Sequence, residues 1–271
     1  MNKKIVVIIL TYNSEKIIKK TIKSAKKISN DVIILDSFSK DKTIKIAKKL
    51  KCKVFKRKFS NYSDQRNYII RKCNNLYQWQ LHLDSDEILS NQLIKNINNV
   101  LRDNENYSYI IKRKVYFLGK FLKFGGASNW HLRLFPSNST LVEDKLYDQH
   151  YITKLRTRSL EGPIFDMNTS NLNNWIDNHN KWSTLDVASK LKKNKKILKG
   201  KFFGNNIERL RLYKNIYLLF PTIIRPFILF FYKYFILLGF LDGKVGFYYC
   251  FLNSLWFRTL IDAKNYEKKN K

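Results

Sequence analysis

The sequence predicts an α/β fold with a mostly parallel sheet, followed by a basic helical extension. Three observations support this prediction. Apolar, β-branched runs alternate with amphipathic segments through roughly the first ninety residues, polar or acidic clusters follow these runs directly, and the composition changes again near residue 190. Strands that alternate with helices along the chain are typical of parallel sheets with right-handed crossovers. The 271 residues are enough for one or two domains.

Residues 5–10 form a continuous apolar run, as expected for a strand buried on both faces of a parallel sheet. Ser14 is the predicted N-cap of a helix that extends to about residue 28 and carries its apolar side chains on one face. Further strands are predicted at 32–35, 53–55 and 79–83, and further helices at 41–50 and 63–72. Acidic residues end the second and fourth strands, where ligands bind in such sheets.

The pattern changes from about residue 107. A strand is predicted at 107–117, a glycine-containing loop at 118–129, an alternating strand at 130–135 and a helix at 171–191. We therefore expect a domain over residues 1–190, with halves at 1–105 and 106–190, and an extension over 191–271.

The charge balance points to an anionic partner. The chain has 52 Lys+Arg against 21 Asp+Glu, a net charge of +31, which suits nucleic acid, acidic lipid or a phosphorylated substrate. With 44% hydrophobic residues the chain is not disordered. The three cysteines show no metal-ligand spacing, and the first apolar run, at 5–10, is too short for a signal peptide. A reducing, cytosolic compartment is expected.

Residues 190–271 combine positive charge with apolar runs. They hold 18 Lys+Arg against 4 Asp+Glu, a net charge of +14. Charged residues interrupt apolar, aromatic-rich runs at 216–224, 226–232, 234–241 and 245–257. Each run is shorter than the roughly 20 residues of a spanning helix. The pattern favours helices that lie in the plane of a membrane surface, and the alternative is a helical subdomain packed on the sheet.

Two acidic motifs carry the chemistry. Asp84 and Asp86 follow a buried strand and are separated by one residue, so in an extended segment their carboxylates point the same way. Two such oxygen ligands form a partial site for Mg²⁺ or Mn²⁺, with substrate phosphates and water in the remaining positions. Asp36 ends the second strand, where an acidic residue commonly contacts the ribose or base of a nucleotide. Asp41, in the same segment, is equally well explained as part of a helix cap.

Four motifs occur in a characteristic order and spacing: IILTYNSE at 8–15, LDSFSKDKT at 35–43, DQRN at 64–67 and LDSDE at 83–87. In these motifs the chain resembles the family 2 glycosyltransferases with the GT-A fold, in particular the branch that builds bacterial lipopolysaccharide core, capsule and related surface glycans. Later stretches, at 130–135, 148–150 and 175–182, are also similar but less diagnostic. The family usually has glycine where this chain has Phe38, and small residues at Lys40 and Lys42, so the turn beside the nucleotide is expected to differ.

The resemblance implies an inverting transfer from a nucleoside-diphosphate sugar, with UDP-sugars as the default donors, to a hydroxyl of a glycan or glycolipid. It places Thr11 and Asp36 at the nucleoside, Arg66 near the base or diphosphate, and Mn²⁺ or Mg²⁺ on Asp84 and Asp86, with Asp86 the firmer ligand. The implied nucleotide-sugar site comprises Thr11, Tyr12, Asn13, Asp36, Ser37, Arg66, Asp84, Ser85 and Asp86.

The reaction also needs a base that accepts the proton of the acceptor hydroxyl. Candidates in the second half of the domain are Glu143, Asp144 and Asp148, and we select Asp148 because it lies in the stretch that resembles the acceptor-side motif of the family. His150 is the next candidate for the base after these carboxylates. A solvated acidic loop explains any one of these carboxylates equally well. The four histidines show no zinc spacing, and His82 and His131 are expected to be structural.

Two other classes of protein are disfavoured. A nucleic-acid-binding protein would suit the charge, but no such motif is present, and carboxylates would stand where phosphate must go. A sugar nucleotidyltransferase needs a glycine-rich loop after its first strand, and residues 11–14 contain no glycine. We therefore expect a peripheral enzyme on the cytoplasmic side of the cytoplasmic membrane, with an anionic lipid surface and no nucleic acid among its partners.

Overall fold

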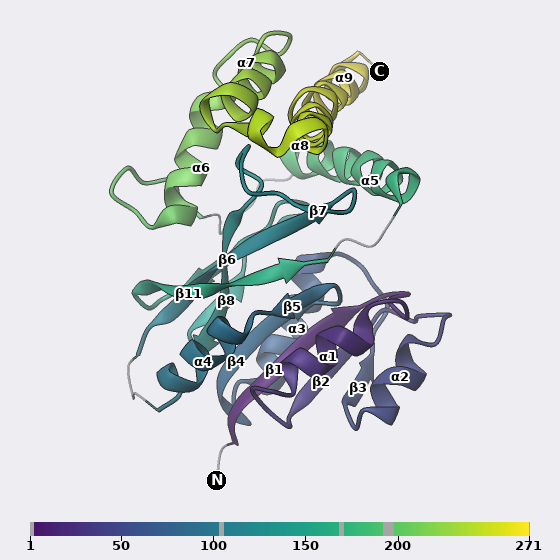
Figure 1. The fold of residues 1–271 in the computed structure, drawn as a ribbon, viewed down its shortest axis with the longest axis vertical. Coiled ribbons are helices and arrows are strands. Elements are labelled where there is room, and N and C mark those ends of the chain that lie inside the picture. Colours follow the sequence, from purple (N-terminus) through teal and green to yellow (C-terminus); the bar gives the residue numbers. More distant parts are fainter. Residues whose placement is uncertain (1–2, 103–105, 168–170, 192–197, 271) are drawn as a thin grey trace. The chain divides into compact units, whose positions relative to one another are not determined.

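The computed structural model describes residues 3–102, 106–167, 171–191 and 198–270 (Figure 1). The chain forms two compact units. Unit 1 consists of residues 1–113, 130–143 and 149–169, and unit 2 of residues 114–129, 144–148 and 170–271. The chain therefore leaves unit 1 and returns to it twice. This division differs from the expected cut at residue 190, because helix α5 and the segment 114–129 pack with the C-terminal helices.

Four neighbouring strands of the sheet are parallel, in the order β3-β2-β1-β4. They are β1 (Lys3–Thr11), β2 (Val32–Asp36), β3 (Lys53–Lys56) and β4 (Tyr77–Asp84). Figure 1 shows β1 and β2 running side by side. In the register, Thr11 lies opposite Asp36 and Leu10 lies opposite Asp84. The predicted polar clusters therefore end at one edge of the sheet.

Three helices of unit 1 connect these strands, as the alternating pattern predicted: α1 (Ile18–Ala25), α2 (Thr43–Lys49) and α3 (Tyr62–Cys73). A further helix, α4 (Asn91–Val100), comes after β4 in the chain and was not predicted. The predicted N-cap at Ser14 is wrong, because α1 begins at Ile18 after a turn. The Ser14 hydroxyl is instead engaged with Ser85 and the carbonyl of Tyr12, and its N–H donates to the Thr43 hydroxyl. Tertiary bonds thus replace the cap.

Antiparallel strands extend the sheet in the order β4-β8-β6-β11-β5. They are β5 (Glu87–Leu89), β6 (Ser108–Phe117), β8 (Asn129–Pro136) and β11 (Thr157–Asp166), with β7 (Lys120–Phe121) paired to the end of β6 and a separate pair, β9 (Thr140–Val142) and β10 (Tyr151–Thr153). The segment 118–129, predicted as a loop, contains the short strand β7. The predicted α/β class, with a parallel half and a C-terminal helical region, is confirmed.

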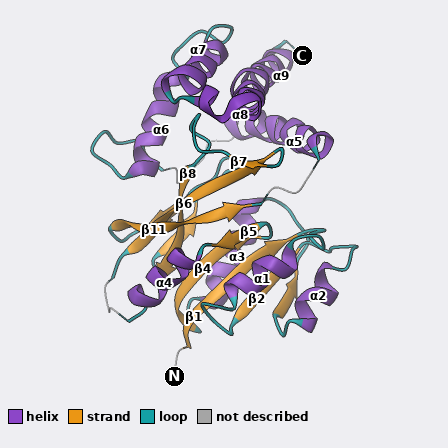
Figure 2. Cartoon of the chain, viewed as in Figure 1, coloured by secondary structure: helices purple, strands orange, loops and turns teal. Residues whose placement is uncertain are grey.

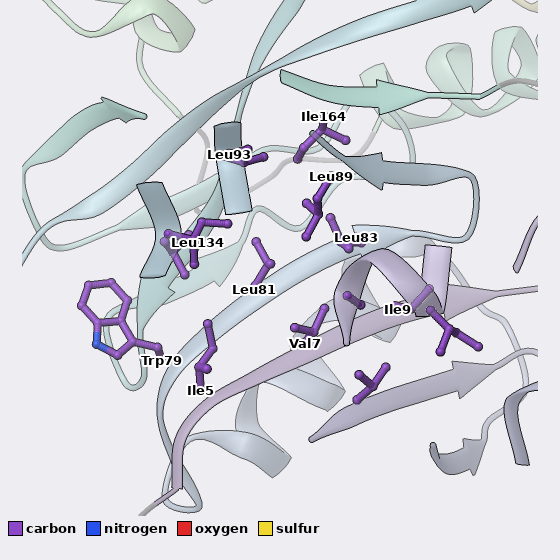
Figure 3. Packing of buried hydrophobic residues seen from close by; sticks show 14 of the residues in the cluster. Ile5, Val7, Ile9, Trp79, Leu81, Leu83, Leu89, Leu93, Leu134 and Ile164 are labelled. Atoms are coloured by element: carbon purple, nitrogen blue, oxygen red, sulfur yellow. The ribbon is translucent and has the colours of Figure 1, made fainter. Parts of the chain in front are cut away.

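The core of unit 1 lies between the sheet and its helices. Side chains from one face of β1 and β4 interdigitate there with Leu89, Leu93, Leu134 and Ile164 (Figure 3). Alternate residues on the other face of β1, Val6 and Ile8, belong to a second cluster. Because β1 is buried on both faces, it has the continuous apolar run that predicted its place inside the sheet.

Unit 2 is mainly helical (Figure 2). Its helices are α5 (Leu172–Leu191), α6 (Asn206–Tyr217), α7 (Arg225–Phe231), the π-helix η1 (Tyr232–Ile236), the 3-10 helix η2 (Gly239–Asp242), α8 (Gly243–Cys250), the π-helix η3 (Phe251–Trp256) and α9 (Phe257–Lys269). Phe257 and Ile261 of α9 pack on Val187 of α5. No single described helix is long and apolar enough to cross a membrane, although the bent pair 225–236 and 239–269 passes the same test by length and composition.

Unit 2 also exposes a large apolar surface. Of the 30 exposed large hydrophobic side chains among the described residues, 22 lie between residues 202 and 251. The most exposed of these are Phe202, Phe203, Leu219, Ile223 and Ile236. We call the exposed hydrophobic side chains of residues 202–251 the helical apolar surface. A soluble protein rarely exposes so much apolar area unless the surface meets a partner or a membrane.

Candidate functional site

The loops that follow β1 and β2 are tied together at the carboxyl edge of the parallel strands. The Thr11 hydroxyl donates a hydrogen bond of 3.0 Å to the carboxylate of Asp36, which is fully buried. The backbone N–H of Ser39 donates to the same carboxylate at 2.8 Å, and the Ser39 hydroxyl does so as well. The Asn13 side-chain oxygen accepts from the N–H of Lys40 at 2.9 Å. Thr11 and Asp36 are thus brought together, while their contacts with the nucleoside stay predictions.

Two exposed aromatic residues lie in these loops. Tyr12 follows β1 and is 58% exposed, and Phe38 follows β2 and is 53% exposed. The backbone of Phe38 has a φ of 62°, in the left-handed region that glycine adopts readily and a bulky residue rarely does. The resembling family usually has glycine there, which is consistent with this backbone. Ser37, the residue before Phe38, donates its backbone N–H to the carbonyl of Thr11 at 3.0 Å.

Helix α1 positions the turn that carries the Asp-x-Asp motif. The Thr21 hydroxyl donates a hydrogen bond of 2.7 Å to the carbonyl of Ser85, and the side-chain oxygens of Ser14 and Ser85 lie 2.8 Å apart. Thr21 is fully buried, so solvent does not compete for its hydroxyl group. These two contacts hold Ser85, the middle residue of the motif, against α1. They thereby orient Asp84 and Asp86 on either side of it.

Asp84 is held between two arginines. Arg66 of α3 donates to one carboxylate oxygen at 2.6 Å, and Arg133 of β8 donates to the other at 2.9 Å. Burial opposes ionisation of Asp84, but the two guanidinium groups outweigh it and hold its pKa well below the ordinary value. Both carboxylate oxygens of Asp84 thus contact arginines, so Asp84 is less available than Asp86 as a metal ligand.

Arg133 also pairs with Glu87. The same Nη2 atom that contacts Asp84 lies 2.6 Å from Oε1 of Glu87, and the other Glu87 oxygen accepts the backbone N–H of Asp84 at 2.9 Å. Glu87 is fully buried and Arg133 nearly so. Removal of one partner from a buried pair of this kind costs about 3–5 kcal/mol. Arg133 is therefore needed to hold the acidic turn in place.

Asp86 lies beside Asp166, the last residue of β11. The N–H of Met167 donates to the Asp86 carbonyl at 2.9 Å, which holds the end of β11 against the turn. Burial and the negative charge of Asp166 raise the pKa of Asp86 well above its ordinary value. Arg113 pairs with Asp166 at 3.3 Å, yet burial still raises the pKa of Asp166. The two carboxyl groups lack the positive charge that would keep both of them ionised.

The carboxyl groups around this turn outnumber the guanidinium groups, so a divalent cation would supply the missing positive charge. The carboxyl groups are those of Asp84, Asp86, Glu87 and Asp166, and the guanidinium groups are those of Arg66, Arg113 and Arg133. Within the described ranges, no three His, Cys, Asp or Glu side chains form a ready-made metal centre. Asp86 and Asp166 are two oxygen ligands of the kind that Mn²⁺ and Mg²⁺ take together with water and substrate phosphates.

The three candidate bases lie in different surroundings. Glu143, in unit 1, is fully buried, and its Oε1 lies 2.8 Å from both the N–H and the Nδ1 of His150. Asp144, in unit 2, is exposed. Asp148, also in unit 2, accepts from Lys214 at 2.6 Å and from Arg211 at 3.5 Å, both on α6. The choice of Asp148 stays a prediction.

Asp166, Arg113, Arg133 and Glu87 were not selected from the sequence. Arg133 stood in the alternating stretch 130–135, where an arginine at an inward position signals a buried ion pair. Glu87 directly follows Asp86. Asp166 gave no signal, because the strand that it ends was not predicted.

Comparison with known proteins identifies the class of enzyme that this arrangement belongs to. The model of the family described as "Glycosyl transferase family 2" matches residues 6–165, which is more than half of the chain. The chain belongs to glycosyltransferase family 2 and is a glycosyltransferase. The matched region includes all four motifs on which the resemblance rested.

Curated relatives agree with this assignment. An uncharacterized glycosyltransferase of Rickettsia typhi is 35% identical over 108 residues, 40% of this chain and 36% of the relative. One of Rickettsia prowazekii is 25% identical over 208 residues, 72% of this chain and 70% of the relative. The Rickettsia typhi match thus spans little more than a third of that protein's length.

The chain is also similar to solved structures in complex with nucleotide sugars. Staphylococcus aureus TarS in complex with UDP-GlcNAc matches over 97% of this chain and 92% of its own, with 14% identity and a TM-score of 0.46. Glucosyl-3-phosphoglycerate synthase from Mycobacterium tuberculosis in complex with Mn²⁺ and UDP-glucose matches over 43% of this chain and 44% of its own, with 18% identity and a TM-score of 0.34.

His82 gives this site a testable pH dependence. It is fully buried, stacks on Phe135, and burial followed by the charges of Arg66 and Arg133 lowers its pKa well below the ordinary value. The unfolded chain takes up this proton near pH 6.5 and the folded chain does not, so stability is lost as the pH falls. Between pH 7.5 and 5.5, His82→Gln should lose about 1 kcal/mol less unfolding free energy than the wild type in denaturant titrations. Equal losses would show that folded His82 is protonated.

Proposed function

We propose that the protein is a metal-dependent, inverting glycosyltransferase that uses a nucleoside-diphosphate sugar. The proposed acceptor is a hydroxyl of a lipid-linked glycan or of a lipopolysaccharide-type oligosaccharide. A UDP-sugar is the donor to test first, because UDP-sugars are the commonest donors in the family. The observation that carries the proposal is the placement of the Asp86 turn against the end of β11, where the N–H of Met167 donates to the Asp86 carbonyl and Asp166 pairs with Arg113, at the sheet edge that also holds Thr11 and Asp36.

The donor site has a basic part and an acidic part. The proposal places the nucleoside at the loops after β1 and β2, where the exposed rings of Tyr12 and Phe38 offer aromatic faces to a base. Arg66, which pairs with Asp84 and donates to the Tyr151 hydroxyl at 2.6 Å, supplies positive charge near the diphosphate. Asp86 and Asp166 would hold Mn²⁺ or Mg²⁺, which neutralises the charge that develops on the departing diphosphate.

The acceptor hydroxyl needs a carboxylate to take its proton. In this proposal the base is Asp148, whose contacts with Lys214 and Arg211 stabilise its charged form. Glu143 and Asp144 are the alternatives. Glu143 is occupied by two contacts to His150, which leaves it less free to accept a proton from a substrate than an accessible carboxylate would be.

The helical apolar surface supports a peripheral position on a membrane. It combines exposed aromatic and aliphatic side chains with basic residues of the same unit, such as Lys199, Lys201 and Arg209. Lys199 and Lys201 directly precede Phe202 and Phe203 in the chain, and basic residues next to exposed aromatic ones suit the interface between lipid headgroups and acyl chains. We therefore propose that the enzyme binds the cytoplasmic leaflet and meets a lipid-borne acceptor there.

The metal assignment is tested by comparing carboxylates. Asp86→Asn should lower sugar transfer by at least about 10³-fold, because several kcal/mol of charge stabilisation in the transition state are lost. Asp166→Asn should raise the Mn²⁺ concentration needed for half-maximal activity. The exposed Glu161→Gln is the matched control and should leave both quantities unchanged. Full wild-type activity in excess EDTA would contradict the proposal.

The base assignment is tested by removing basicity while keeping shape. Asp148→Asn should bind nucleotide normally but turn over about 10²-fold more slowly or worse, since proton transfer by a positioned group contributes at least that much. Asp144→Asn and Glu143→Gln are measured beside it. If one of these two loses turnover with unchanged nucleotide binding while Asp148→Asn remains active, the base is that other carboxylate.

Membrane binding is tested on exposed side chains, which can be changed without disturbing the core. Phe203→Ser combined with Ile223→Ser should weaken cosedimentation with vesicles that contain phosphatidylglycerol by about tenfold or more, because each buried apolar side chain contributes about 1.5–3 kcal/mol. High salt should release the wild type. Leu76→Ser, at an exposed position of unit 1, is the control. Unchanged binding of the double variant would exclude the helical apolar surface as the contact.

A further inference from the structure

Two helices of unit 1, α1 and α2, lie in stretches that are rich in lysine. Residues 16–27 contain six lysines, residues 42–51 contain five, and neither stretch contains an aspartate or a glutamate. Helix α3 differs, because it carries Asp64 among its basic residues. The positive charge of unit 1 is therefore concentrated on α1, α2 and the turns beside them.

These lysines project away from the core. Ile18 and Ile22 of α1 are fully buried, whereas Lys20 and Lys23 are exposed. At about 100° of rotation per residue, the two lysines lie on the side of the helix opposite to the two isoleucines. Every lysine of the two stretches is exposed except Lys26, which is half-buried. The charged groups are thus accessible to a partner.

Helices α1 and α2 present their lysines on the same side of unit 1. The two helices contact each other (Figure 1). Ala25 of α1 and Ala47 of α2 belong to the same core cluster as Ile34 of the sheet, whereas Ile69 of α3 packs on the opposite face of the sheet. The outer sides of α1 and α2 therefore form one surface, and we call the lysines of the two stretches the lysine face.

The lysine face has no carboxylate partner within the described part of the chain. No ion pair there involves any of its lysines, and Lys27 reaches only the side-chain oxygen of Asn91, at 3.3 Å. The acids that directly precede the two stretches, Glu15 and Asp41, accept the backbone N–H groups of Lys42 and Glu15 at 2.9 Å each. Like charges three or four residues apart destabilise a helix, so a bound anionic partner would stabilise this surface.

The residue types of the lysine face favour a broad anionic surface over a small ligand or a nucleic acid. A lysine ammonium is a hydrated point charge on a flexible stem, whereas the arginine fork holds a phosphate in a fixed geometry. The two stretches contain no arginine, and they contain no aromatic residue on which bases could stack. They also expose no large apolar side chain, so contact requires no insertion into the partner.

We propose that the lysine face binds the anionic headgroups of a membrane surface. Acidic lipids give a leaflet a negative surface potential, which attracts basic residues within about one Debye length and needs no fixed pocket. The inference goes beyond the proposed function, in which the lipid contact is made by unit 2 and its exposed apolar side chains. The lysine face gives unit 1 an affinity of its own for the leaflet, and that affinity depends on charge alone.

The test measures cosedimentation of the full-length protein with phosphatidylcholine vesicles that contain increasing shares of phosphatidylglycerol. Binding of the wild type should strengthen with that share and weaken as salt is added. The variant Lys20→Gln/Lys23→Gln/Lys45→Gln/Lys49→Gln should bind at least about tenfold more weakly, because each lysine near an anionic leaflet contributes a several-fold factor. Replacement of the same four lysines by Arg keeps the charge and should preserve binding. Equal binding by the glutamine variant and the wild type would overturn the proposal.

A matched control removes four exposed cations of unit 1 that lie outside the lysine face. It is the variant Arg71→Gln/Lys72→Gln/Lys112→Gln/Lys154→Gln, which should bind the vesicles nearly as tightly as the wild type does. If it loses as much affinity as the lysine-face variant, the attraction comes from net charge and the assignment to α1 and α2 is wrong. Thermal unfolding followed by circular dichroism shows whether each variant is folded under the assay conditions.

Two comparisons separate this inference from its alternatives. If the wild type binds duplex DNA more tightly than the vesicles at the same salt concentration, and the lysine-face variant loses that binding, the surface binds nucleic acid and the membrane assignment fails. The variant Phe203→Ser/Ile223→Ser is assayed in parallel. A loss of vesicle binding in that variant alone would overturn the lysine face and leave the unit 2 contact standing. Donor hydrolysis without vesicles tests the transferase assignment separately.

Discussion

The acidic turn after β4 depends on one buried guanidinium group. Arg133 joins Asp84 to Glu87 through a single nitrogen, and both carboxylates would otherwise be negative charges beside a third, Asp86, in a region of low polarity. The arginine comes from β8, the strand that pairs antiparallel to β4. The antiparallel half of the sheet thus supplies the positive charge that stabilises the acidic residues at the end of β4. Such an arrangement holds the turn in place and leaves the carboxyl group of Asp86 for the proposed cation.

Much of unit 1 could be predicted from local pattern. The continuous apolar run of β1 predicted a strand buried on both faces, and acidic residues at the ends of β2 and β4 predicted the functional edge of the sheet. The parallel arrangement of β1 and β2, predicted from the alternating pattern, brings Thr11 opposite Asp36. Local rules failed at Ser14. A serine before an apolar helix usually caps it, but tertiary hydrogen bonds to Ser85 and Thr43 use this residue differently.

The remaining features depend on contacts between distant parts of the chain. Asp166 ends a strand that has a proline and a glycine within it and little alternation, so neither the strand nor its terminal acid was evident. Its importance comes from its approach to Asp86, eighty residues earlier. The length of the apolar runs in 216–257 predicted helices that do not span a bilayer singly, but not which side chains face outward. That depends on how α9 packs against α5.

The π-helix η3 has a consequence for the continuous helical stretch 243–269. Side chains of α8 and the start of η3, such as Phe247, Tyr248 and Phe251, are exposed, whereas Phe257 and Ile261 of α9 are buried against α5. One α-helical residue corresponds to a rotation of about 100°, and a π-turn takes in an extra residue. The wider turn lets one continuous helical stretch direct two sets of apolar side chains to different sides, one exposed and one packed against α5. In evolutionary terms, the gain or loss of a single codon in this turn would rotate everything downstream, turning an internal packing face outward or the reverse.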